Sequence, residues 1–535
     1  MAEVQDSASV EKASGRFDEN SEEYRKMTRR VLWKLDMHVL PPLAFLWLAN
    51  FIDRTNIGNA RIVGLEADTH LHGNQFNSAL AVFYASYILS ELPSNWVVKK
   101  VRANRWLPFL VAAWGIITTL SGLVENFSGL LAVRIMLGFC EGGLLPGIIL
   151  YLSSMYKRHE LQLRVGIFYA SASLSGAFGG LLATAILKMN GKGGLAGWRW
   201  IFILEGIVTV VFGVIASFIL PADLQTASFF TPDEREHAIY RFRVHNLASS
   251  RAPLSDAAKA AKDEKYKGRT PSMEKKDEDS HSDLQSDSDK IALVNQEEEQ
   301  FEWREVIRGL TDIQVWLTGI AYLGLIVSLY SYSLFLPTIV AGLGYSGGRA
   351  QLHTVPPYVP AVFLTVIVAF LADRLKWRGP FILMFLPLTI AGYILAIVAK
   401  TTTGRYAAVF MMAAGVYPSG PCILSILPNN SSGHYKKATT TALQLMIANC
   451  GGFIATFIYT ADQKPRYLRG HKIALAFVCL AWFLIFCNVM YCKWENKARR
   501  EGRRQGNVEK YQQLWDAGLT KAPIGDRSPD FRFTL

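Results

Sequence analysis

The sequence lacks the motifs of a soluble enzyme. No GxSxG, HExxH or P-loop pattern stands at a plausible site, and the six cysteines form neither a CxxC pair nor a Cys/His metal pattern. All six cysteines fall in or beside apolar segments, which indicates small packing residues. The polar, acidic segment 1–24 has no hydrophobic region of the kind that a cleaved signal peptide carries. We therefore expect no enzyme activity, cofactor or metal, and a first membrane helix that acts as a signal anchor.

The composition is that of a membrane protein. The chain has 535 residues, 50% of them hydrophobic and 12% aromatic, and the apolar residues come in blocks. Its net charge of +12 does not indicate nucleic-acid binding, because the basic residues stand beside the apolar blocks, as expected at membrane flanks. Blocks long enough to cross a bilayer lie at about 38–58, 76–98, 106–124, 129–151, 164–188, 199–220, 313–341, 355–373, 379–399, 405–427, 439–460 and 472–492.

These blocks predict an all-α polytopic membrane protein with twelve transmembrane helices in two six-helix, pseudo-symmetric bundles. A polar stretch separates the two sets of six, and its serine-rich, charged middle is typical of a disordered linker. Two equal halves predict an internally repeated transporter with its site between them. The expected parts are a disordered N-terminal segment, a first bundle, a largely disordered linker, a second bundle and a tail, at 1–35, 36–221, 222–311, 312–492 and 493–535.

The flanking basic residues predict the orientation. An even number of crossings places both termini on one side, and most Lys and Arg clusters fall on that same side. The basic last loop, which contains Lys464 and Arg466, weakens this bias without reversing it. We expect both termini and the linker to lie in the cytoplasm.

The stretch 134–147 carries two charges inside an apolar run. Arg134 and Glu141 are seven residues apart, which places them on nearly the same helix face, roughly 10 Å apart along the axis. Charges inside a membrane are costly, so the stripe is either a buried structural ion pair or a binding and proton-relay face. Glycines at 138, 142, 143 and 147 allow a neighbouring helix to approach the backbone closely.

Several motifs, in order along the chain, resemble those of the fungal allantoate and nicotinate permeases. These proteins form part of the anion:cation symporter group of the major facilitator superfamily. The matching segments are 51–61 (FIDRTNIGNAR), 134–147, 197–206 (GWRWIFILEG), 336–339, 352–358, 449–452 and 465–467, and the loop 371–378 resembles the superfamily's Asp-Arg loop motif. The loop Pro93-Ser-Asn departs from the pattern, so gating detail there is not transferred.

The resemblance implies the major facilitator fold and proton-coupled movement of a small organic anion by alternating access. It also implies roles in anion binding and proton coupling for Asp53, Arg54, Arg134 and Glu141. The chemistry agrees, because Arg offers a bidentate fork for a carboxylate. We therefore expect Arg54 and Arg134 to bind substrate, and Asp53 or Glu141 to carry the proton. The alternative for Asp53 and Arg54 is a salt bridge that caps the outer end of helix 1.

The second half has almost no charge within its spans, so it is expected to supply aromatic and neutral polar contacts. Tyr330 and Asn449 are among the candidates there, with Tyr87 facing them from the first half. The other candidates are Tyr322, Tyr332, Ser419 and Ser425. Asp373 and Arg374 are expected to belong to the cytoplasmic gate. Structural, gating or pairing roles are more common for Glu91 and Glu205 than substrate contact.

The leading hypothesis is a monomeric plasma-membrane importer that takes up a carboxylate such as nicotinate or allantoate together with protons. A proton-driven exporter of a metabolite or drug is the nearest rival, because an Arg-rich lining does not set direction. A nutrient receptor that has lost transport is a third hypothesis. The partners expected are the small anion, protons and the lipid bilayer, without nucleic acid.

Overall fold

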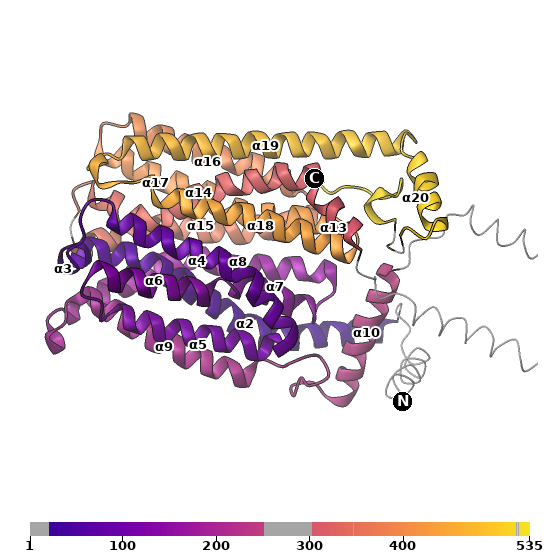
Figure 1. Cartoon of the computed structure of the whole chain (residues 1–535), viewed down its shortest axis with the longest axis horizontal. Coiled ribbons are helices and arrows are strands. Elements are labelled where there is room, and N and C mark those ends of the chain that lie inside the picture. Colours follow the sequence, from indigo (N-terminus) through magenta and orange to yellow (C-terminus); the bar gives the residue numbers. More distant parts are fainter. Residues whose placement is uncertain (1–20, 251–301, 346, 521, 523) are drawn as a thin grey trace, which may run out of the picture.

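The computed structural model describes residues 21–250, 302–345, 347–520, 522 and 524–535. In this part of the chain the elements are all helical, and the long helices run along one axis of the molecule (Figure 1). The indigo-to-magenta helices of the first half lie beside the orange-to-yellow helices of the second half. The predicted all-α, two-bundle architecture is therefore confirmed.

The first bundle contains six helical spans within the described residues. They are α2 (Glu22–Ala60), α4 (Gln75–Val101), α5 (Ala103–Ser121), α6 (Phe127–Glu141) with α7 (Leu144–Ser153), α8 (Arg158–Ile186) and α9 (Gly197–Ile219). The fourth span, predicted as one helix over about 129–151, runs through α6 and α7, which are separated only by the turn residues Gly142 and Gly143. Both glycines keep right-handed helical dihedrals and directly follow Glu141.

The second bundle repeats this plan in the described residues. Its spans are α14 (Ile313–Ala341), α15 (Gly347–Leu375), α16 (Arg378–Val398), α17 (Thr402–Asn430), α18 (His434–Thr456) and α19 (Leu468–Arg500). Eight of the twelve spans are individually long and apolar enough to cross a membrane. The other four, α4, α5, α8 and α18, pack against these eight.

The segment that precedes the first span differs from expectation. Residues 22–35 are helical rather than disordered, while residues 1–20 lie outside the described part of the chain. Ser21 caps the helix by accepting a hydrogen bond from the backbone N–H of Tyr24 at 3.1 Å. Farther along, Lys34 forms an ion pair with Glu234 of helix α10 (Pro232–Ser250) at 2.7 Å. Contact with α10 therefore helps to stabilise the N-terminal extension of α2.

Helix α10 lies in the segment that was predicted to be a largely disordered linker. Its buried His237 lies 2.9 Å from the Thr28 hydroxyl, measured from Nε2 to Oγ1, and Arg241 donates to Glu160 of α8. Burial, together with the cations Arg241 and Lys157, lowers the pKa of His237 to about 4. Helix α13 (Trp303–Leu310) also lies within the predicted linker, and residues 251–301 are outside the described part.

The C-terminal segment packs against the second bundle. Asp526 accepts from Lys436 and forms an ion pair with Arg308 at 2.7 Å, and the backbone N–H of Arg378 donates to the Leu535 carbonyl at 2.7 Å. Helices α10, α13 and α20 (Gly506–Asp516) lie at one end of the molecule, here called the α10 end (Figure 1). The short helix α3 (Glu66–Asp68) marks the opposite α3 end.

The two halves meet through close helix pairs, chiefly α8 with α15, α4 with α18 and α2 with α14. Glycine allows this approach at two seams. A Cβ atom added to Gly58 would lie 2.3 Å from the carbonyl oxygen of Leu334, and one added to Gly452 would lie 2.5 Å from the ring of Tyr84. Residues from both halves therefore reach a common central region.

Candidate functional site

Arg54 is the centre of the polar contacts between the two halves. Its Nη1 donates to the Tyr330 hydroxyl of α14 at 2.7 Å, and its Nε donates to Glu141 Oε2 at 3.1 Å. The guanidinium carbon lies 4.8 Å from the centroid of the Tyr87 ring. Its Nη2 is buried and has no hydrogen-bond partner among the described residues. The structure thus brings together four of the residues selected from the sequence.

Glu141 is fully buried at the end of α6, with 0% of its surface exposed. Its Oε2 accepts from Asn50 Nδ2 at 2.7 Å as well as from Arg54, whereas Oε1 has no partner in the described part of the chain. The glycine beside it explains the position. A Cβ at Gly142 would lie 2.3 Å from the Tyr87 carbonyl oxygen, so only glycine lets α6 approach α4 this closely.

Arg134 does not form the ion pair with Glu141 that was one of the two alternatives for this stripe. The ionic partner of Glu141 is Arg54 on α2. The two residues share a helix face, but the roughly 10 Å between them along the axis leaves Glu141 within easier reach of a neighbouring helix. Arg134 is 3% exposed and makes no hydrogen bond or ion pair with a described residue. Its guanidinium donors are therefore available to an anion.

Asp53 and Arg54 do not form the alternative salt bridge either. Asp53 Oδ2 accepts from Trp114 Nε1 and from the Thr118 hydroxyl of α5, both at 2.7 Å. Successive helical residues point about 100° apart, so Asp53 faces α5 while Arg54 faces α6 and α14. Its Oδ1 is buried with no partner among the described residues. Asp53 is thus held within the first bundle.

Glu205 of α9 belongs to the same buried group, although the sequence favoured a structural role for it. Asn56 of α2 donates to one of its carboxylate oxygens, and the other is buried with no partner in the described residues. Asp53 and Arg134 lie close enough to act on it electrostatically. The cluster of Asp53, Arg54, Arg134, Glu141 and Glu205 is called the charge cluster below.

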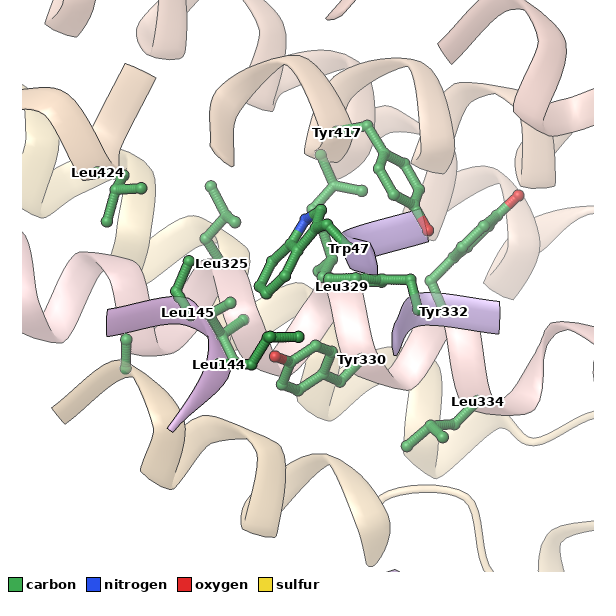
Figure 2. Close-up of a cluster of buried hydrophobic side chains, with 14 of the residues drawn as sticks. Trp47, Leu144, Leu145, Leu325, Leu329, Tyr330, Tyr332, Leu334, Tyr417 and Leu424 are labelled. Carbon is green, nitrogen blue, oxygen red and sulfur yellow. The ribbon is translucent and has the colours of Figure 1, made fainter. Parts of the chain in front are cut away.

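A small cavity of about 20 Å³, room for roughly one water molecule, lies between the halves. None of the five charge-cluster residues lines it, but two of its lining residues, Tyr87 and Tyr330, contact Arg54. It is lined almost entirely by aromatic and aliphatic side chains: Trp47, Phe51, Tyr87, Leu145, Tyr322, Leu325, Ile326, Leu329, Tyr330 and Leu445, with Gly420 and Asn449. Figure 2 shows Trp47 among leucines of α14 and α7, with the Tyr330 hydroxyl directed toward Leu144 and Leu145. Tyr87, Tyr330 and Asn449, predicted as substrate contacts, all line this cavity.

The predicted gate residues lie away from the cavity. Asp373 and Arg374 stand near the last turn of α15, at the α10 end, where Asp373 is half-buried and Arg374 is exposed. Neither makes a hydrogen bond or ion pair with a described residue. The nearby Arg378 is buried and donates to the Thr534 hydroxyl at 3.2 Å.

Sequence reasoning missed the neutral partners of the charge cluster. Asn50 stands four residues before Arg54, and Asn56 stands three residues after Asp53, so each shares a helix face with a charge. This spacing was a usable signal. Trp114 carries no such signal, because a tryptophan in an apolar block reads as packing.

Comparison with known proteins agrees with this architecture. Residues 43–456 match the Major Facilitator Superfamily. An uncharacterised transporter of Schizosaccharomyces pombe is 34% identical over 506 residues, which are 94% of this chain and 90% of that protein. The high-affinity nicotinic acid transporter of Saccharomyces cerevisiae is 29% identical over 511 residues, which are 95% of this chain and 85% of that protein.

Among solved structures, an inward-facing bacterial homologue of the human lysosomal transporter Spinster superposes with a TM-score of 0.57 at 15% identity. The match covers 88% of this chain and 97% of that one. The chain belongs to the major facilitator superfamily. It is a multi-pass membrane transporter and not an enzyme, as the sequence predicted.

Proposed function

We propose that this chain is a proton-coupled symporter that moves a small organic anion, of the size and type of nicotinate, by alternating access. The match to the nicotinic acid transporter of Saccharomyces cerevisiae supports a carboxylate substrate. The aromatic and aliphatic cavity wall supports a compact, largely apolar body for that anion.

The charge cluster is the observation that carries the proton coupling. Three carboxylates and two guanidiniums are buried together, so the fully ionised cluster has a net charge of −3 + 2 = −1. A net charge away from water is costly, and one bound proton removes it. Entry of a monoanion restores the imbalance, and a second proton, bound by Glu141, removes it again while the first stays on Asp53 or Glu205. Anion binding and proton binding are therefore linked through charge balance.

The guanidiniums supply the anion contacts. Arg54 lies beside Tyr87 and Tyr330, which line the cavity. Its Nη2 has no partner among the described residues and can donate to a carboxylate oxygen. Arg134 is the second cation, with Nε also unpartnered in the described residues. An anion that draws Arg54 toward itself weakens the contact with Glu141 and favours protonation of that carboxylate.

The proposal includes a location and an orientation. Basic residues cluster in the helix flanks of the α10 end, which supports a cytoplasmic position for that end and for both termini. The plasma membrane is the proposed location. A single chain is the proposed working unit, because the cavity is formed between the two halves of one chain. Asp373 and Arg374 at that end are the proposed gate residues.

Uptake of labelled nicotinate and allantoate into cells that express the chain, with and without a proton uncoupler, tests this proposal. We expect uptake that the uncoupler abolishes and that Arg54→Lys strongly reduces at equal surface expression. Arg405→Lys is the matched control, because Arg405 lies in the first turn of α17, away from the cavity. It is expected to transport normally. Outward movement of the label, or binding without movement, contradicts the proposal and favours an exporter or a receptor respectively.

A further inference from the structure

Glu91 and Asn449 connect the two halves beside the cavity. Asn449 Nδ2 on α18 donates to Glu91 Oε2 on α4 at 3.0 Å, and each residue is 8% exposed. Asn449 lines the cavity, and so does Tyr87, which stands one helical turn before Glu91. A carboxylate that has no direct role in the charge cluster is therefore held against a side chain of the cavity wall.

This contact orients the Asn449 amide. An ionised carboxylate can only accept hydrogen bonds, so while Glu91 is ionised the amide nitrogen faces it and the carbonyl oxygen faces away from it. Within the described residues, no group donates to Asn449 Oδ1, and this oxygen is not sealed from a water-sized probe. The amide therefore presents an acceptor to the cavity.

The rest of the cavity lining offers few other hydrogen-bonding groups to a ligand. Apart from Asn449, the tyrosine hydroxyls and the indole N–H of Trp47, which can only donate, the lining offers aromatic and aliphatic surface. The Tyr330 oxygen already accepts from Arg54. A ligand N–H or O–H group at Asn449 gains a hydrogen bond, whereas an apolar or acceptor group there leaves Oδ1 desolvated without a partner.

We propose that the Glu91–Asn449 pair selects, among the small carboxylates of the proposed function, those that carry an N–H or O–H donor away from the carboxylate. Asn449 is the specificity-determining residue, and Glu91 is the positioning residue that fixes its amide. The inference rests on the proposed anion transport and adds a chemical requirement to it. The favoured substrates are flat, aromatic hydroxy- or amino-carboxylates.

The expected effect follows from the worth of one neutral hydrogen bond. A net contribution of about 0.5–1.5 kcal/mol corresponds to roughly a two- to tenfold difference in affinity. Glu91→Gln removes the preference, because the glutamine amide can donate as well as accept and so permits both orientations of Asn449.

Thermal stabilisation of the purified full chain by three matched compounds measures this preference. The probes are 4-hydroxybenzoate, 4-aminobenzoate and 4-fluorobenzoate, which share a carboxylate and a ring but differ in the donor. In the wild type we expect the hydroxyl and amino compounds to reach half-maximal stabilisation at a concentration roughly two- to tenfold lower. In Glu91→Gln and Asn449→Leu we expect this ratio to fall to about one.

Asn77→Ser is the matched control. Asn77 also joins α4 to α18, by donating to the Thr456 carbonyl, but it stands at the α3 end of the seam. It is expected to keep the wild-type ratio. Equal affinities in the wild type, an unchanged ratio in Glu91→Gln, or a ratio lost equally in Asn77→Ser each overturn the inference. If neither these compounds nor nicotinate stabilise the wild type, the proposed anion transport fails and the inference falls with it.

Discussion

Replacing Glu141 by glutamine tests whether charge balance couples protons to transport. The change removes one negative charge from the charge cluster, which leaves Asp53 and Glu205 opposite Arg54 and Arg134. Glutamine has nearly the same volume, and its amide oxygen can still accept a hydrogen bond from Arg54. The variant therefore resembles a permanently protonated cluster that can no longer release that proton.

The expected cost in stability is moderate. Removing one partner of a buried ion pair commonly costs about 3–5 kcal/mol, because the other charge is left unpaired. Arg54 keeps its contact with Tyr330, and two carboxylates remain for two guanidiniums, so we expect about 1–2 kcal/mol here. A second substitution, Asp53→Asn, leaves a single carboxylate in the cluster. The double variant should then lose clearly more than the sum of the two single variants.

Two assays on purified protein separate the roles. Thermal unfolding in detergent reports the stability of Glu141→Gln, Asp53→Asn and the double variant. Proteoliposomes report exchange of labelled substrate and, separately, accumulation driven by a pH gradient. We expect Glu141→Gln to fold and to exchange substrate at a rate near that of the wild type. Accumulation driven by the gradient should be lost, because the proton cycle is broken while binding and alternating access persist.

Two results would refute this reasoning. If Glu141→Gln alone is as unstable as the double variant, Glu141 serves Arg54 as a purely structural partner. Normal gradient-driven accumulation in Glu141→Gln would show that the coupling proton is carried elsewhere, with Asp53 as the next carboxylate to test.

Three further predictions address other parts of the molecule. Arg54→Lys should reduce transport at least about tenfold, because an ammonium cannot donate to Tyr330 and a carboxylate with the same planar fork, and an unchanged apparent KM would contradict this. Gly138→Ala should destabilise the fold by about 1–3 kcal/mol, because the new Cβ would lie 2.4 Å from the Phe83 carbonyl oxygen of α4. The control is Gly129→Ala on the same helix, whose Cβ would meet its nearest atom at 3.3 Å and which should unfold at the wild-type temperature. The pKa of His237 is lowered to about 4 from its ordinary 6.5, so the undocked helix takes up a proton first as the pH falls. Docking of α10 should therefore weaken by about 1–2 kcal/mol between pH 6.5 and 4, which faster hydrogen exchange in α10 would reveal. The variant His237→Gln should abolish that pH dependence.

The spans could be predicted because bilayer thickness imposes a length on every crossing segment. Apolar blocks of about twenty residues mark the helices, and the polar stretch between them marks the two halves. The sequence predicted that Gly142 and Gly143 allow a neighbouring helix to approach closely. It could not show that this neighbour is α4, whose atoms occupy the space where a Cβ atom would stand. The helical segment 22–35 was missed for a related reason, because its partner Glu234 lies two hundred residues away.

The charge cluster shows where sequence reasoning ends. Helical periodicity identifies which residues share a face, and it placed Arg134 and Glu141 on one stripe. Periodicity cannot say which neighbouring helix supplies a partner, so it could not show that Glu141 pairs with Arg54 on another helix. The requirement proposed to hold across the bundle is charge balance. On that proposal, a proton offsets the excess of buried carboxylates over buried guanidiniums, and Glu205 supplies the excess carboxylate. A residue whose own helix suggests only a structural role would then set the number of protons that the site binds.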